Sequence, residues 1–297
     1  MELRKVSDKV YYIKNSTNIG VVTNGSSAIL IDSGLDGDTA KRVLQLLAKE
    51  SLTVKALINT HSHADHCGGN YFLKQHADIK IFAPEKEADI VENPYFEPFF
   101  LFSGANPPKP LQNKFLMAKP SPVDYILREG EDAIEIEGIK LSIVPLPGHS
   151  LNQIGLAVDG VLFCADFVFS REVLSKHGIP FCVDIEKQRK SLLDMESKKY
   201  KLYIPSHGDP TEDLTEMIEA YLEVIARVTL DIAEALSAPR STEQIFSELC
   251  TLYGINIKSM QQYYLMMTAV LAYLSYLSDE GVLRSCMQNN LLLWQKC

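Results

Sequence analysis

The chain has 297 residues, of which 46% are hydrophobic and 23% charged, and its formal net charge is −9. This composition excludes a largely disordered chain, because there is enough apolar material for a core. The acidic balance argues against a general nucleic-acid binder. The N-terminus lacks the apolar stretch of a secretory signal, and the six scattered cysteines form no CxxC pair. We therefore expect a cytoplasmic protein with free thiols.

Strand and helix patterns alternate in the first third of the chain. Asn24 and Gly25 mark a hairpin turn between two strands, and Asp38 is placed to cap a helix. Two further helices are expected over 70–76 and 84–91. The predicted strands run over residues 10–14, 18–23, 27–32, 54–60 and 79–83.

Residues 93–122 interrupt this alternation with seven of the 14 prolines and five of the 12 phenylalanines. So long a Pro-rich stretch predicts no regular element. Its aromatic side chains, Phe99 among them, suit a lid or wall over a substrate pocket. They are equally typical of a loop that packs against the rest of the chain or of a dimer contact. The sequence does not decide between a pocket wall and these structural roles.

Strand patterns resume after this segment, and helices dominate the C-terminal third. A helix is expected over 185–197, followed by a long one over 211–236 after a short strand. The uncharged stretch 259–278 contains Gln261, Gln262 and four tyrosines, which favours a buried or oligomer-interface helix over a membrane span. The remaining expected strands are 124–128, 134–138, 140–146, 153–159, 161–166 and 201–205. The tail is expected to contain a helix over 242–252 and extended pieces around 281–284 and 291–294.

Residues 60–69 carry the densest chemical signal, Thr-His-Ser-His-Ala-Asp-His-Cys-Gly-Gly, directly after an apolar strand. Imidazole nitrogen and carboxylate oxygen are ligands that zinc, iron and manganese accept. Residues two apart in an extended turn converge on one ion, so His61 and His63 suit one metal. Asp65 and His66 then suit a second.

Three more candidates, His149, Asp166 and His207, each end a predicted strand, so all seven donors are expected at one edge of a sheet sandwich. Two metals about 3.5–4 Å apart can share a hydroxide. The expected division has His61, His63 and His149 at the first site, Asp65, His66 and His207 at the second, and Asp166 bridging them. Outside this set, Cys67 and His76 are expected to have no chemical role, while His177 and Phe99 are candidates for substrate contact.

The loop at 61–66 resembles the His-x-His-x-Asp-His signature of the metallo-β-lactamase superfamily. His149, Asp166 and His207 follow in the order that this family shows, and the turn around Asp32 is similar to its early Asp-Thr-Gly element. The resemblance covers about residues 6–210 and implies an αββα sandwich of two sheets flanked by helices. It further implies that Asp32 supports the metal loop from behind, and that Asp65 is both a ligand and a proton carrier.

Residues 240–297 resemble the small winged-helix-like domain of the β-lactamase-like-protein-2 branch. This tail has four basic and four acidic residues, and its candidate recognition helix is uncharged. It is therefore expected to pack or dimerise and not to contact nucleic acid. The expected α/β organisation is a catalytic domain over 1–210, with 93–122 as an insertion, and a mainly helical domain over 211–297. The second region is also a candidate for the mouth of the active site.

Together these features predict an enzyme, a hydrolase in which hydroxide held by two divalent ions cleaves a thioester, lactone or phosphodiester of a small molecule. Zinc is expected first, with iron or manganese as alternatives. The aromatic segment favours a partly apolar acyl or lactone substrate, and the basic glutathione-binding tail of a glyoxalase II is not found. The alternatives are a mononuclear iron oxygenase of the persulfide dioxygenase type and a ribonuclease. A homodimer without membrane contact is expected.

Overall fold

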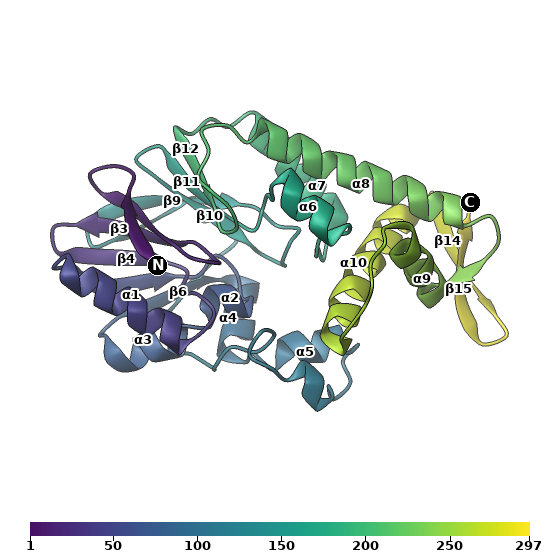
Figure 1. The fold of residues 1–297 in the computed structure, drawn as a ribbon, viewed down its shortest axis with the longest axis horizontal. Helices are drawn as coiled ribbons and strands as arrows, with labels where there is room; N and C mark the ends of the chain where they lie inside the picture. The colour runs from purple at the N-terminus through teal and green to yellow at the C-terminus, as the bar shows by residue number, and fades with distance from the viewer.

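Two β-sheets lie face to face in the computed structural model of residues 1–297 (Figure 1). The first sheet has seven strands in sequence order, antiparallel from β1 to β4 and parallel from β4 to β7. They are β1 (Glu2–Lys5), β2 (Val10–Lys14), β3 (Ile19–Asn24), β4 (Ser27–Ile31), β5 (Thr53–Ile58), β6 (Lys80–Pro84) and β7 (Tyr125–Leu127). Asn24 belongs to β3 and pairs with Ser27, so the turn consists of Gly25 and Ser26, one residue later than predicted.

The second sheet has five strands in the order β12-β11-β10-β9-β8, with only β11 and β12 parallel. Side chains from both sheets, among them Ile58, Leu156 and Phe163, form the buried core between them. Each such buried side chain contributes roughly 1.5–3 kcal/mol, which holds the sheets together. The strands are β8 (Ala133–Ile136), β9 (Ile139–Pro145), β10 (Ile154–Val158), β11 (Val161–Ala165) and β12 (Leu202–Pro205).

Helices cover the outer faces, which confirms the predicted αββα sandwich. On the first sheet, α1 (Gly37–Lys49) and α3 (Asn70–His76) bury Val43, Leu47 and Leu73 in one apolar cluster. The cap of α1 is Asp36, whose carboxylate accepts from the Thr39 N–H, so the prediction of Asp38 was wrong. The other helices of the sandwich are α2 (Ala64–Cys67), α4 (Glu85–Glu92), α6 (Arg171–His177) and α7 (Ile185–Glu196). Neither β1 nor α6 was predicted.

The segment 93–122 contains a short helix, α5 (Phe96–Leu101), and a 3-10 turn, η1 (Lys109–Leu111), where no regular element was predicted. Pro98 fits α5 because it lies in the first turn, where a backbone N–H has no partner within the helix. Leu101, Leu111 and Leu116 of this segment pack near the C-terminal helix α10 (Met260–Asp279) in a small apolar cluster that includes Tyr264 and Leu265. Asn113 also donates a hydrogen bond to Gln261 on that helix, at 3.0 Å.

The C-terminal part is mainly helical, as predicted, while its likeness to a winged helix stays a prediction. Helices α8 (Thr215–Ala235), α9 (Thr242–Leu252) and α10 are followed by a hairpin of β14 (Leu283–Gln288) and β15 (Leu291–Lys296). The short β13 (Arg240–Ser241) adds a third strand beside β15. Asn289 and Asn290 both have positive φ, as a tight two-residue hairpin turn requires.

One apolar core joins this part to the sandwich. It runs from Leu162 on β11 through Leu192 on α7 and Tyr221 on α8 to Tyr273 on α10. Neither α10 nor any other helix has the length and hydropathy of a membrane span. Helix α10 and the 93–122 segment pack against each other within one chain, although Phe100 and Phe115 of the segment and Leu271 of α10 stay exposed. The homodimer and the domain division at 210 stay predictions.

Candidate metal centre and the cavities beside it

The seven candidate ligands gather at one edge of the sandwich, because each follows the end of a strand. His61, His63, Asp65 and His66 lie in the loop and short helix α2 after β5. His149, Asp166 and His207 follow β9, β11 and β12 in the other sheet. Strand ends of two packed sheets therefore bring together residues up to 146 positions apart, from His61 to His207.

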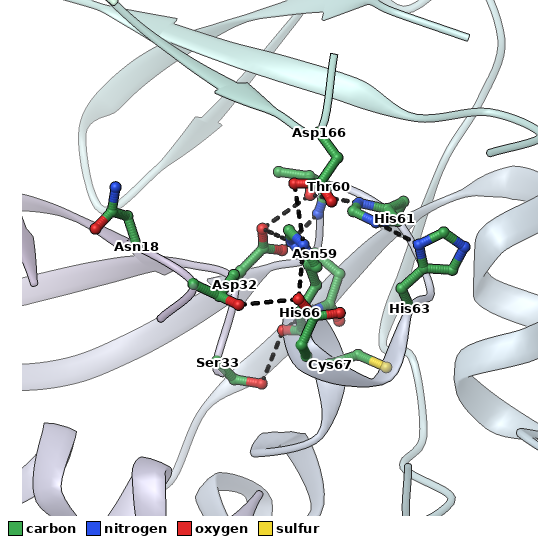
Figure 2. A network of polar contacts seen from close by, with 12 residues as sticks. Asn18, Asp32, Ser33, Asn59, Thr60, His61, His63, His66, Cys67 and Asp166 are labelled. Carbon is green, nitrogen blue, oxygen red and sulfur yellow. Dashed lines mark hydrogen bonds and ion pairs between the residues drawn. The ribbon is translucent and has the colours of Figure 1, made fainter. Parts of the chain in front are cut away.

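Three histidines form the first donor group. Nδ1 of His63 lies 3.1 Å from Nε2 of His61 and 3.0 Å from Nε2 of His149. Figure 2 shows the rings of His61 and His63 meeting beside Asp166. The donor atoms of all three lie within 4.8 Å of one another, close enough to surround one ion.

Asp65, His66 and His207 form the second group, also within 4.8 Å. Nε2 of His207 lies 3.4 Å from Oδ2 of Asp65 and 3.3 Å from Oδ2 of Asp166. The same Oδ2 of Asp166 is 3.5 Å from Nε2 of His149, in the first group. Asp166 thus contacts both groups, in the position expected of a bridging ligand.

Unusual backbone at three strand ends aims these side chains. Asp32, at the end of β4, and Ala165, directly before Asp166, both have positive φ, of 63° and 52°. Gly148 precedes His149 with φ 135°, and a Cβ there would lie 2.4 Å from the backbone of Gln188. A side chain at Gly148 would clash with Gln188 and open this turn. Positive φ at Asp32 and Ala165 costs conformational energy, so the backbone that positions the ligands is locally strained.

Asp32 holds His66 from behind, as Figure 2 shows. Its Oδ2 accepts from Nδ1 of His66 at 2.8 Å, and both carboxylate oxygens accept from Thr60. This bond directs Nε2 of His66 into the cluster. There Nε2 and Oδ1 of Asp166 are buried without hydrogen-bond partners, 3.4 Å apart. Buried polar atoms without partners are costly, and a cation between them would satisfy both.

The charges in the cluster also suit a cation. Burial, with the neighbouring His63, lowers the pKa of His149 to about 3, so its imidazole is neutral at pH 7. Neutral imidazole is the form that binds metals. Burial alone would lower the pKa of His207, but the Asp166 carboxylate outweighs it and raises this pKa to about 10. In the metal-free protein, the positive charge of protonated His207 therefore offsets part of the negative charge of the Asp65 and Asp166 carboxylates, which a bound metal would otherwise neutralise.

Two polar contacts that the sequence did not reveal position the second group. The hydroxyl of Thr17 donates to Oδ2 of Asp65 at 2.9 Å. Nδ1 of His207 donates to the carbonyl of Ser16 at 3.0 Å, which leaves Nε2 facing Asp65 and Asp166. Both contacts come from the turn between β2 and β3.

Glu87 on α4 is a second support that the sequence did not reveal. Its carboxylate is fully buried and accepts four hydrogen bonds. Two come from the N–H and hydroxyl of Ser62, at 3.0 and 2.5 Å. The others come from the hydroxyl of Ser150 at 2.7 Å and the N–H of Asn152 at 2.8 Å. Glu87 thus ties the loop of His61 and His63 to the loop of His149.

Two cavities open beside the cluster. The smaller, about 160 Å³, has four of the seven candidate ligands in its wall, and the larger, about 320 Å³, lies next to it. Both cavities are lined by His63, Glu97 and Phe181. The larger also has Thr268 of α10 in its wall, so the C-terminal part contributes to the mouth of the site, one of the roles considered for it.

The structure does not bring the two predicted substrate contacts into these cavities. His177 lies exposed at the end of α6 and lines neither cavity. The ring of Phe99 packs against Tyr95 and Phe100 instead, while Phe100 itself lines the larger cavity. The thiol of Cys67 is buried and donates to the Ser62 carbonyl, outside the donor groups.

A family model described as the metallo-beta-lactamase superfamily matches residues 13–207. The match covers more than half of the chain and contains every candidate ligand from His61 to His207. The chain therefore belongs to the metallo-β-lactamase superfamily, which confirms the predicted family.

Several curated relatives that match carry the printed name hydroxyacylglutathione hydrolase. The one from Serratia proteamaculans is 29% identical over 143 residues, which is 48% of this chain and 43% of that protein. The one from Photobacterium profundum is 27% identical over 160 residues, 52% of this chain and 48% of that protein. The chain spans about half the length of the curated relatives it matches.

Solved structures match over nearly the whole chain. A beta-lactamase domain protein from Burkholderia ambifaria has a TM-score of 0.79 at 19% identity, covering 100% of this chain and 94% of that one. A metallo-beta-lactamase family protein from Thermus thermophilus has a TM-score of 0.71 at 18% identity, covering 95% and 94%. At these identities the likeness shows the fold alone, and it includes the C-terminal helices.

Proposed function

We propose that this protein is a metal-dependent hydrolase that holds two divalent ions, zinc foremost, and cleaves an ester-like bond of a small molecule. The observation that carries the proposal is the pair of donor groups with Asp166 in contact with both. His61, His63 and His149 would hold one ion, and Asp65, His66 and His207 the other. Membership of the superfamily supports a hydrolase.

Bound divalent ions polarise a carbonyl and lower the pKa of water, which supplies a nucleophile at neutral pH. The chain's own residues would hold the ions and transfer the proton. The side chain of Asp65 is 36% exposed, against 7% for Asp166, and it lines the smaller cavity. It accepts a hydrogen bond from Thr17, which orients the carboxylate to take up a proton and pass it to the leaving group.

Thioesters are the bond type that we propose first. The printed name of the relatives, hydroxyacylglutathione hydrolase, supports this choice for the part of the chain that they match. The Phe-lined cavities support an apolar acyl or lactone group, because Phe100, Phe115 and Phe181 lie in their walls. Phosphodiesters are less favoured, since no lysine or arginine lines either cavity.

A zinc-loaded enzyme assayed against one thioester, one lactone and one phosphodiester tests the proposal. We expect thioester or lactone cleavage that falls at least about 100-fold in Asp65→Asn, because the proton carrier is lost. His76→Ala is the matched control, since His76 lies on α3 and bonds only to the Phe72 carbonyl. Failure of the wild type to cleave any of the three compounds would overturn the proposed activity.

A further inference from the structure

The larger cavity has mainly apolar walls with one carboxyl group that has no partner. Its apolar wall consists of Ile90, Phe100, Leu101, Leu151, Phe181 and Val183. Most of its polar groups are already used within the protein. Ser62 and Ser150 donate to Glu87, and the hydroxyl of Thr268 donates to the Tyr264 carbonyl.

Glu97 on α5 is the exception. Its side chain makes no hydrogen bond or ion pair, although the residue is half-buried and lines both cavities. Burial raises the pKa of this carboxyl group above its usual value. A carboxyl group without a partner at the junction of two cavities is available to a ligand that extends from the metal cluster into the apolar space.

Charge in both cavities is negative apart from any bound metal. The acidic lining residues are Asp65, Glu87, Glu97 and Asp166, and no lysine or arginine is among the rest. Asp65 and Asp166 belong to the donor groups, and Glu87 is satisfied by four hydrogen-bond donors. A carboxylate on a ligand beside Glu97 would therefore meet a like charge with no lysine or arginine in the cavity wall to offset it, which is unfavourable in a partly dry site.

We propose that the larger cavity is the acyl subsite and that Glu97 determines its specificity by charge. The subsite takes apolar acyl groups that are uncharged or cationic where they pass Glu97, and it excludes acyl groups that carry a carboxylate at that point. This proposal rests on the hydrolase function proposed above, because it takes the metal end of the smaller cavity as the place of the scissile carbonyl.

The test compares three thioesters that share one leaving group and chain length, with an ammonium, a methyl or a carboxylate group on the part of the acyl chain that would lie beside Glu97. Because burial raises the pKa of Glu97, the assays are run near pH 8 and not at acidic pH, to favour its ionised form. We expect wild-type kcat/KM to fall in the order ammonium, methyl, carboxylate. In Glu97→Gln we expect the carboxylate compound to improve about tenfold and the ammonium compound to weaken about tenfold, with less than about threefold change for the methyl compound.

Glu85→Gln is the matched control, because Glu85 is exposed in the first turn of α4 and lines neither cavity. It should keep the wild-type order. Equal changes for all three thioesters in Glu97→Gln would overturn the proposal, since a merely structural role would affect them alike.

Binding separates this proposal from the proposed activity. The three corresponding acyl amides, titrated into the zinc-loaded protein by calorimetry, report on the subsite without turnover. If the amides bind in the expected order and the Glu97→Gln variant loses that order, the proposed subsite is supported even where no thioester is cleaved. If thioesters are cleaved but neither rates nor binding respond to charge, the hydrolase stands and the subsite is wrong.

Discussion

The donor cluster and the larger cavity share His63, yet they are held by different kinds of contact. Buried hydrogen bonds fix the cluster, through Asp32 behind His66 and Glu87 behind the loops of Ser62 and Ser150. Apolar packing between α5 and α10 fixes much of the cavity wall. Hydrogen bonds demand one geometry, whereas apolar walls tolerate changes of shape. We therefore expect metal binding and substrate choice to be separable by substitution.

Asp166→Ala is the substitution expected to have the largest effect. It removes the carboxylate that contacts both donor groups and leaves His66 and His207 without it. We expect activity to fall by more than about 100-fold and metal content to fall in both groups. Elemental analysis and a kinetic assay measure these two effects. A fully active Asp166→Ala variant would show that Asp166 is not part of the metal site.

Asp32→Asn tests the support behind one ligand. The carboxylate that orients His66 becomes an amide, while its volume is kept. Zinc affinity should fall about 10–100-fold, as is usual for partners of metal-ligating histidines. A competitive titration with a zinc chelator gives the affinity, and an unchanged value would contradict the positioning role of Asp32.

Glu87→Gln should have a smaller effect, spread over two loops. Gln cannot accept all four hydrogen bonds, so we expect a loss of about 1–3 kcal/mol in the free energy of unfolding. Zinc affinity should fall about tenfold as the two loops loosen. Chemical denaturation and the chelator titration measure both, with Glu85→Gln as the control. Wild-type stability in Glu87→Gln would show that the loops do not depend on this carboxylate.

Phe100→Ala tests the cavity wall and should leave the metal untouched. The Phe100 side chain lines the larger cavity and is 55% exposed, so its loss widens the cavity without exposing the core. We expect KM for an apolar acyl thioester to rise severalfold with zinc content unchanged. Loss of zinc in this variant would contradict the separation of wall and cluster.

The donor cluster was predictable because its ligand-type residues stand at recognisable places in the local sequence, directly after predicted strands. Three histidines and an aspartate follow one strand, and the other three candidates end strands as well. The ends of strands in packed sheets meet at one edge, so topology gathered them. The αββα sandwich was predicted from the resemblance to the family, while the strand and helix periodicity predicted the individual elements.

A pocket wall from residues 93–122 was one of the predicted alternatives, but the residues that line the cavity and the supporting carboxylate of Glu87 were not predictable in this way. Glu87 lies on a helix where Ala88, Ile90 and Val91 are also buried, and nothing local marks it as a hydrogen-bond acceptor. The cavity wall combines α4, α5 and α10, whose approach depends on tertiary packing. Phe99 was predicted as a substrate contact, but its neighbour Phe100 lines the cavity instead. No helix was predicted there, so the sequence could not indicate which ring faces the cavity.

Metal content per chain tests most directly whether the two donor groups hold two ions. Elemental mass spectrometry of the purified wild type should find about two zinc or manganese ions per chain. His63→Ala should retain fewer, and His76→Ala should match the wild type. About one iron per chain in the wild type would favour oxygen chemistry over hydrolysis. Protein that stays metal-free when offered zinc would contradict the account.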